Sequence, residues 1–307
     1  MRSADGRYVY FESSATNLTT DHLSRQPSVY VRDRTAGTTT RIDLPGDDGA
    51  ANRLLAVSTN GRFALMLSTG ATAFWRYDRQ TGTATPVAGA FRWAPAYSIS
   101  DDGDLVSLGE AVERLRDGTF LNLTCPNGSN TFYGPDYVRF AGDGSAVYFT
   151  TDECGQFSLT AFRYDVATKT TTKMLPGACT FNSGNLCVEQ IVPTVSDAHW
   201  AMKRLANVEP GLVYNIYIDG NPIPGIAAVL WLCGVSEDGS RVAYMAPSGQ
   251  GPNGYTWSVF SIDVATAAVH QISPDSLSAG CTDHAFSGST DSVAYEYDQQ
   301  IYLDPVP

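Results

Sequence analysis

The fold is decided by a short stretch near the start of the chain, Ser3-Ala4-Asp5-Gly6-Arg7-Tyr8-Val9-Tyr10-Phe11. The pair Asp-Gly is typical of a tight turn, because glycine tolerates positive φ and aspartate hydrogen-bonds to nearby backbone N–H groups. The alternating aromatic and β-branched residues that follow are typical of a strand packed on both faces. The stretch therefore predicts a turn followed by a buried strand.

Altered copies of this turn and strand recur along the whole chain. Seven can be counted, at residues 3–11, 58–65, 100–106, 141–149, 195–202, 236–244 and 287–297. In the fifth copy Ala198 and His199 stand where glycine and arginine are expected, and in the seventh the turn falls at Thr290-Asp291-Ser292. The copies are about 40 to 55 residues apart. A period in this range is typical of a propeller or a solenoid.

A second repeated unit lies between the copies, at residues 28–42, 73–87, 161–170 and 259–266. Each begins with an aromatic-rich run, turns at aspartate and a Thr-Gly or Ala-Thr pair, and returns through a Thr-rich run, which is the pattern of a hairpin with a polar outer strand. Together the two units supply four antiparallel strands per repeat. Four such strands repeated radially form the blades of a β-propeller.

These repeats resemble those of the TolB-like β-propellers, which are secreted bacterial proteins. The match is closest in the first repeat, where Ala15-Thr16-Asn17-Leu18 also fits, and it weakens at Ala198 and around Arg116-Asp117-Gly118. It covers essentially the whole chain. The resemblance implies a fold and very little about activity, because propellers serve as enzymes, binding modules and scaffolds alike.

We therefore predict an all-β chain that forms one domain over residues 1–307, a seven-bladed β-propeller with four-stranded antiparallel blades. Six blades are the alternative. The terminal blades are expected to be incomplete, because no inner strand fits before Ser3 and no outer strand follows Ile301-Tyr302-Leu303. The missing inner strand favours the removal of residues upstream of Met1 over an irregular closure of the ring.

Composition and charge narrow the classes of partner. With 307 residues, 43% hydrophobic and 17% charged, the chain can bury a large core, and no apolar run approaches the length of a membrane span. The net charge of -12 makes this an acidic protein. It argues against nucleic-acid and anionic-membrane partners, which need a basic surface. Neutral or cationic ligands are easier to accommodate, and we expect a monomer.

The six cysteines are an even number without Cys-x-x-Cys spacing, which favours disulfides over a zinc site. Their places in the repeats predict the pairs Cys125–Cys154, Cys179–Cys187 and Cys233–Cys281, and buried free thiols are the alternative. Disulfides indicate an oxidising compartment, so we expect an extracellular or periplasmic protein. No leader is visible at Met1-Arg2-Ser3-Ala4, so export requires one that this chain lacks.

Signals for enzymatic chemistry are sparse. Of four histidines, His199 is predicted on the opposite face from His22 and His284, and His270 on an outer strand, so a three-histidine metal centre is not expected. His284 beside Asp283 is the best acid–base candidate, against the alternative of a histidine hydrogen-bonded within the strand layer. No cofactor is expected. Three acidic pairs carry the right oxygens for calcium, although a turn or solvated loops explain them equally: Asp47-Asp48, Asp101-Asp102 and Asp152-Glu153.

Ligands of propellers usually lie where the loops lead into the inner strands, over the central channel. Counting back from each turn predicts the residues that line this mouth: Asn52, Arg53, Arg92, Trp93, Asp136, Tyr137, Glu189, Gln190, Trp231, Asp283 and His284. Aromatic rings beside arginine and carboxylate groups suit sugars, peptides or small polar metabolites. The alternative is that Trp93, Tyr137 and Trp231 pack between blades.

Three functions follow from these residues. The first is a secreted, non-enzymatic propeller that binds a polar ligand, a glycan or a protein surface, through Asn52, Arg53, Arg92, Trp93, Tyr137, Gln190 and Trp231. The second is a lyase or hydrolase of a polar substrate in which Arg92 stabilises negative charge and the acid–base groups are Asp283, His284, Asp136 or Glu189. The third is a scaffold or interaction module of a larger envelope protein.

Overall fold

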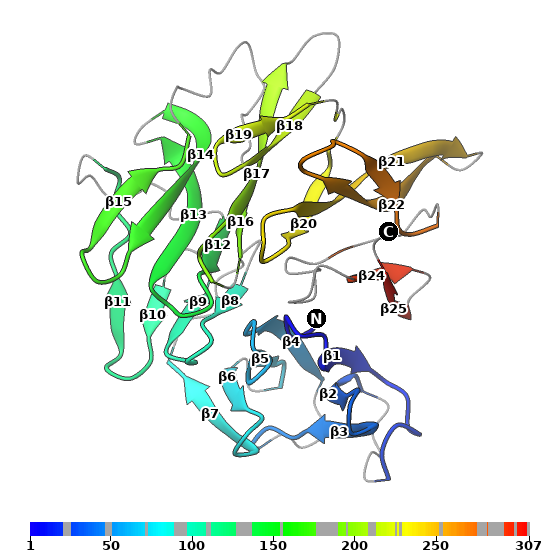
Figure 1. Cartoon of the computed structure of the whole chain (residues 1–307). Coiled ribbons are helices and arrows are strands. Elements are labelled where there is room, and N and C mark those ends of the chain that lie inside the picture. Colours follow the sequence, from blue (N-terminus) through cyan, green and yellow to red (C-terminus); the bar gives the residue numbers. More distant parts are fainter. Residues whose placement is uncertain are drawn as a thin grey trace.

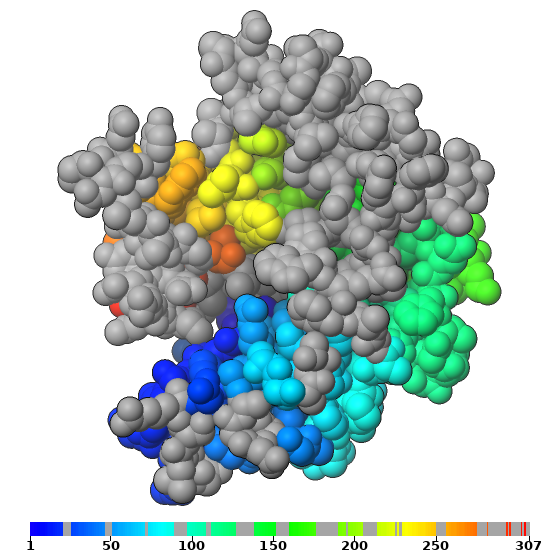
Figure 2. Space-filling view, turned by 180° about the vertical axis from the view of Figure 1, so that it is seen from behind, coloured from blue at the N-terminus to red at the C-terminus, as the bar shows by residue number. Residues whose placement is uncertain are grey.

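The computed structural model describes residues 1–20, 26–46, 51–70, 73–88, 97–108, 112–126, 137–153, 156–175, 190–194, 196–207, 213–224, 226, 229–251, 254–274, 281, 292–297 and 300–305. These residues form antiparallel β-sheets that follow one another around a centre (Figure 1). Figure 2, seen from behind, shows the same succession from the blue first sheet through cyan to green. Within this part of the chain no helix has the length and hydropathy needed to cross a bilayer. The predicted all-β propeller is confirmed.

Five sheets have four strands each, and we number the sheets 1 to 7 along the chain. Sheet 2 contains β4 (Asn52–Val57), β5 (Phe63–Ser68), β6 (Ala73–Asp78) and β7 (Thr83–Val87). Sheet 3 contains β8 (Tyr97–Ile99), β9 (Leu105–Leu108), β10 (Val112–Arg114) and β11 (Thr119–Leu121). Sheet 4 contains β12 (Tyr137–Phe140), β13 (Ala146–Glu153), β14 (Gln156–Asp165) and β15 (Thr170–Lys173).

Sheet 5 contains β16 (Gln190–Pro193), β17 (Trp200–Asn207), β18 (Val213–Ile218) and β19 (Asn221–Ile223). Sheet 6 contains β20 (Trp231–Val235), β21 (Arg241–Gly251), β22 (Gly254–Asp263) and β23 (Val269–Gln271). The first strand of each four-stranded sheet contacts the first strand of the next, so β4, β8, β12, β16 and β20 are the innermost strands. His270 lies on β23, the outer strand on which it was predicted.

The two terminal sheets have fewer named strands within the described residues. Sheet 1 contains β1 (Tyr8–Ser13), β2 (Ser28–Asp33) and β3 (Thr38–Ile42), and sheet 7 contains β24 (Ser292–Tyr297) and β25 (Gln300–Pro305). Residues 1–3 also pair with β1: the Tyr10 N–H donates to the carbonyl of Met1 (2.7 Å), and Arg2 forms a bridge with Val9. No named strand precedes β1 and the terminal sheets are incomplete, as expected, although this short segment pairs with β1 at the inner place of sheet 1.

The hydrophobic core lies between the sheets. The described residues form six buried clusters, and each joins two consecutive sheets, from sheets 1 and 2 to sheets 6 and 7. In the first, Tyr10 of β1 and Met66 of β5 are both fully buried. Alternate residues of each strand face the preceding and the following sheet, as the pleat requires. Burial of apolar surface between neighbours therefore stabilises the ring.

Four of the repeated turns, those at Ser3, Ser58, Ser100 and Ser236, are each built by one serine. In the first turn the Ser3 hydroxyl oxygen accepts the N–H of Tyr8 (2.9 Å), and the hydroxyl donates to Asp5, which in turn accepts the N–H of Arg7 (3.0 Å). The turns at Ser58, Ser100 and Ser236 have the same bonds. In these four turns the serine and the Asp or Asn two residues later thus join the innermost strand to its neighbour through bonds within the turn.

Consecutive turns also bond to one another. The N–H of Ala4 donates to the carbonyl of Thr59 (2.6 Å), the N–H of Asn60 to the Asp101 carboxylate (2.8 Å), and the N–H of Asp101 to the carbonyl of Gly142 (3.1 Å). The turns of sheets 1 to 4 therefore form a continuous row on one face of the molecule, which we call the turn face. The opposite face, where the innermost strands begin, we call the mouth face.

The fifth turn differs from its expected register by one residue. Thr194 takes the serine position, since its hydroxyl oxygen accepts the N–H of His199 (3.1 Å). Asp197, with a φ of 61°, therefore occupies the left-handed position, and not Ala198. The Asp197 carboxylate accepts hydrogen bonds from the Tyr148 hydroxyl and from Arg163 (2.6 Å) in sheet 4, and these contacts favour aspartate where the other turns have glycine.

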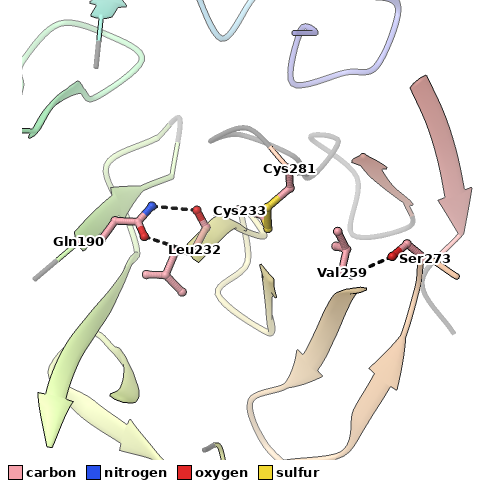
Figure 3. Close-up of a disulfide and its surroundings, with 6 residues drawn as sticks. All are labelled: Gln190, Leu232, Cys233, Val259, Ser273 and Cys281. Atoms are coloured by element: carbon pink, nitrogen blue, oxygen red, sulfur yellow. Dashed lines mark hydrogen bonds between the residues drawn. A yellow bond between two sulfur atoms is a disulfide. The ribbon is translucent and has the colours of Figure 1, made fainter. Parts of the chain in front are cut away.

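The disulfide between Cys233 and Cys281 is confirmed, with the two Cα atoms 5.5 Å apart. It joins the innermost strand β20 to the segment that precedes β24, and so links sheet 6 to sheet 7 (Figure 3). Cys125 is also disulfide-bonded. Cys154, Cys179 and Cys187 lie outside the described residues, so the other two predicted pairs stay predictions.

Candidate functional site

The structure places four of the predicted ligand-binding residues at equivalent ends of four sheets. Asn52, Tyr137, Gln190 and Trp231 are the first residues of the innermost strands β4, β12, β16 and β20. Arg53 follows Asn52 on β4 and its side chain is exposed. Because the innermost strands of neighbouring sheets contact one another, these residues share the mouth face.

The other predicted residues fall outside the described part of the chain. They are Arg92, Trp93, Asp136, Glu189, Asp283 and His284. Of Tyr137 only the backbone is described. The proposed acid–base groups and the arginine beside them therefore stay predictions from the sequence.

Gln190 has a clear structural contact. Its side chain is 2% exposed, and its amide nitrogen donates to the carbonyl of Leu232 (2.9 Å) while its amide oxygen accepts the N–H of Leu232 (2.8 Å) (Figure 3). Leu232 lies on β20 directly before a bulge, where the register with β21 shifts. The amide thus joins sheet 5 to sheet 6 at the mouth face, and its part in ligand binding stays a prediction.

Sheets 1 and 2 are joined in a similar way. The Glu12 carboxylate of β1 accepts the N–H of Leu54 on β4 (2.7 Å), and Leu54 also directly precedes a bulge. A side-chain acceptor from the preceding sheet therefore satisfies the N–H group before each of these two bulges. At Leu232 this is expected, because a buried backbone donor without a partner destabilises the fold.

Lys203 is the residue of the mouth face that the sequence analysis missed. It lies on β17 directly opposite Gln190 and is 6% exposed. Its ammonium donates to the carbonyl of Leu230 (2.7 Å) and lies 4.5 Å from the centre of the Tyr214 ring. Burial lowers the pKa of the Lys203 amine to about 8, because the charged form loses hydration.

The sequence does contain a signal that singles out Lys203, but this signal is visible only when the fifth turn is placed in its correct register. Counted nine residues from the serine position of its repeat, Lys203 is equivalent to Leu67, Thr150 and Met245. The equivalent position is acidic in sheet 1 (Glu12) and apolar or neutral at these three residues, so a basic residue here marks a position that the fold alone does not explain. The shifted fifth turn concealed this equivalence.

Together these residues make a polar end to the packed interface between sheets 5 and 6. Below them lie the apolar Val192, Ala201 and Leu232 of the buried cluster that joins the two sheets. Trp231 is half-buried beside them. An ammonium, an arginine and an indole on one face suit polar groups carried by a small molecule or a glycan, since rings stack on apolar faces and cations bind oxygen atoms.

On the turn face, charged pairs have a structural explanation. Arg7 pairs with Asp33 and Arg62 with Asp78 (2.8 Å each), which joins β1 to β2 in sheet 1 and β5 to β6 in sheet 2. In sheet 5 the same join is made by His199, whose Nδ1 lies 2.6 Å from the Asp219 carboxylate. The histidine therefore substitutes for arginine in a repeated contact.

The structure describes the side chains of one of the acidic pairs considered for calcium, Asp101-Asp102; of Asp152-Glu153, at the end of β13, only the backbone is described. Asp102 accepts hydrogen bonds from Ser100 and from the N–H of Asp104, and Asp101 accepts the N–H of Asn60. These oxygens thus complete two turns. Within the described residues, no group of three acidic, histidine or cysteine side chains could hold a metal ion. The described carboxylates of this pair therefore belong to the turn face.

Comparison with known proteins supports the fold and does not assign a family. No family model matches the chain, and no curated protein matches it. The chain is similar to the structure of an oligogalacturonate lyase from Vibrio parahaemolyticus at 12% identity, with a TM-score of 0.65, over 100% of this chain and 88% of that one.

Two further solved structures are similar to this chain over most of its length. The β-propeller domain of Cps50 (Swd1) from Myceliophteria thermophila is 9% identical, with a TM-score of 0.57, over 100% of this chain and 96% of that one. TolB from Acinetobacter baumannii is 14% identical, with a TM-score of 0.50, over 90% of this chain and 65% of that one. At these identities the likeness concerns the fold alone, and the chain is a β-propeller.

Proposed function

We propose that this chain is a secreted, TolB-like propeller that binds a polar ligand, a glycan in the first instance, at its mouth face and without catalysis. The observation that carries the proposal is that Asn52, Tyr137, Gln190 and Trp231 are the first residues of four innermost strands, where Asn52 and Gln190 are buried. Arg53 adds an exposed cation and Trp231 a half-buried ring. Disulfide bonding at Cys125 and Cys233 supports an oxidising compartment.

The mouth face favours binding over a purely structural role for a physical reason. Loops and strand ends converge there on a small area, so side chains from several sheets reach one ligand at once. The described polar groups of the turn face bond turns to one another and strands to strands, whereas on the mouth face Gln190 and Glu12 join sheets and Arg53 is exposed.

The experiment is a glycan-binding screen followed by affinity measurements on variants. Arg53→Ala and Trp231→Ala are expected to weaken binding about tenfold or more without unfolding the chain. Matched controls lie away from the mouth face: Arg116, whose side chain is 67% exposed beside Asp104, and Phe120, which is 60% exposed on β11. Their alanine variants are expected to bind like the unchanged protein.

The same screen tests the rival readings. Unchanged affinity in both Arg53→Ala and Trp231→Ala would sink the proposed site. Release of shortened or unsaturated products from a bound glycan would show a hydrolase or lyase. If no glycan binds at all, the result favours the third function, a scaffold or interaction module.

A further inference from the structure

Lys203 is a buried cation that has no carboxylate partner among the described residues. Its interactions within the described chain are one hydrogen bond, to the Leu230 carbonyl (2.7 Å), and the face of the Tyr214 ring. The side chains packed beside it, Gln190 opposite and Tyr214 on β18, are neutral, and no described carboxylate lies within ion-pair distance. An ammonium has three donors, so the observed bond leaves two for another acceptor.

The fold does not require a cation at this position. Its equivalents face the next sheet just as Lys203 does, and they are Leu67, Thr150 and Met245, of which Leu67 and Thr150 are buried. In sheet 1 the equivalent is Glu12, whose carboxylate accepts the N–H of Leu54. The bond that Glu12 makes to the next sheet is made in sheet 5 by Gln190, so Lys203 is not needed for that join.

The position of Lys203 gives a ligand a route to it. Its hydrogen-bond acceptor Leu230 is 44% exposed, and the next residue is Trp231, the first residue of β20. The ammonium therefore lies at the outer end of the interface between sheets 5 and 6, on the mouth face. An uncompensated buried charge destabilises a fold, and an anionic oxygen beside it would remove that penalty.

We propose that Lys203 forms an anion subsite of the mouth face, and that the ligand bound there presents a carboxylate to its ammonium. The inference rests on the proposed function and adds the chemical class of the ligand. The Leu230 carbonyl and the Tyr214 ring orient the ammonium, and the ligand carboxylate accepts from its remaining donors.

The net charge of -12 is compatible with this subsite. Charges separated by more than about 8 Å are largely screened at physiological ionic strength. At contact distance the attraction between a ligand carboxylate and the desolvated ammonium exceeds the repulsion from these distant charges, because the local dielectric constant is low. The acidic surface slows the arrival of an anion more than it weakens the bound state.

The chain offers an unusually clean spectroscopic test, because it contains three lysines, Lys169, Lys173 and Lys203. Labelling lysine with ¹³C at Cε gives three signals, and Lys203→Arg identifies the one of interest. In the free protein its titration midpoint is expected at about 8. Acetate or glucuronate is expected to raise it towards the ordinary value of about 10.4, while exposed Lys169 serves as an internal reference.

Affinity measurements complete the test. Glucuronate is expected to bind about tenfold more tightly than glucose, to lose this advantage in Lys203→Met, and to retain it in the control Lys169→Met. A Lys203 midpoint that neither carboxylate moves, or equal affinity for the acid and the neutral sugar, overturns the subsite. Equal, tight binding of both sugars that Trp231→Ala weakens would overturn the subsite alone and leave the proposed function standing.

Discussion

The repeated turns depend on single glycines that meet two demands at once. Gly61 has a φ of 66°, and a Cβ placed on it would lie 2.5 Å from the Cβ of Ser3 in the preceding turn. Gly82 has a similar φ of 69° in the hairpin between β6 and β7, with open space around it. A comparison of the two glycines therefore separates the effect of backbone conformation on stability from the effect of packing between turns.

Alanine at these two positions is expected to destabilise the protein unequally. Gly82→Ala lowers the free energy of unfolding by about 1 kcal/mol, the strain of a left-handed backbone. Gly61→Ala lowers it by about 3 kcal/mol, because Ser3 and its turn must also shift. Urea unfolding of both variants measures the difference, and equal losses would show that the turns do not pack as described.

Glu113 on β10 is a second residue with a measurable signature. It is 3% exposed, its Oε2 has no hydrogen-bond partner among the described residues, and burial raises the pKa of its carboxyl group. The folded chain therefore keeps the proton more tightly than the unfolded chain. Glu113 therefore destabilises the folded protein when it is ionised. This loss of stability is absent below the ordinary glutamate pKa of about 4.3, and it grows as the pH rises towards the pKa of the folded state.

Glu113→Gln is accordingly expected to be more stable than the unchanged protein at neutral pH, with the difference closing as the pH falls below about 4. Asp117→Asn should behave in the opposite way, because hydrogen bonds from Thr119 lower the pKa of Asp117 and its stabilisation is present above the unfolded value. Thermal unfolding across pH measures both. A neutral-pH loss in Glu113→Gln would contradict the burial of a carboxylate whose Oε2 has no partner among the described residues.

At the scale of elements, the innermost strands are held by side chains that bond to the backbone of the next sheet. Gln190 does so at β20 and Glu12 at β4, each beside a bulge. Hydrophobic clusters pack the sheets face to face, whereas these polar bonds fix the position of the next innermost strand along its own axis relative to the preceding sheet.

Gln190→Leu is expected to lower the free energy of unfolding by about 2 kcal/mol, since it leaves the Leu232 N–H and carbonyl without side-chain partners. The loss should be local, and hydrogen exchange at the Leu232 amide should accelerate more than at amides of β5. If exchange at Leu232 is unchanged, the amide does not make the bond that joins the sheets.

The sequence predicts the strands and turns well where the repeat is regular, because Ser-x-Asp-Gly followed by alternating apolar residues leaves one register. It fails at the fifth turn, where Asp197 replaces glycine. The reason lies in sheet 4: Tyr148 and Arg163 bond to that carboxylate, and contacts between distant residues leave no local pattern. The same shift hides Lys203, whereas Gln190 and Trp231 were found by counting from neighbouring turns.

At the scale of the molecule, the disulfide between Cys233 and Cys281 joins the last two sheets, and the segment of residues 1–3 pairs with β1 at the inner place of sheet 1. Figure 1 shows sheet 7 between sheets 6 and 1. The covalent link therefore lies between sheets 6 and 7, one interface away from the junction of sheets 7 and 1. The length of the loop between the two cysteines, 48 residues in sequence separation, makes its loss costly.

Replacing both cysteines by serine is expected to lower the free energy of unfolding by about 4 kcal/mol, from the entropy of the opened loop. Hydrogen exchange should then increase most in β24 and β25, and least in sheets 2 to 4. Uniform loss of protection through all sheets would show that the disulfide does not act at the junction of sheets 6 and 7.

The measurement that tests the central claim most directly is a crystal structure of the protein with the tightest-binding glycan from the screen. The account predicts the ligand on the mouth face, in contact with Arg53 and Trp231, with an anionic oxygen at the Lys203 ammonium. A ligand over the turn face or against the outer strands, with the mouth-face residues untouched, would contradict it.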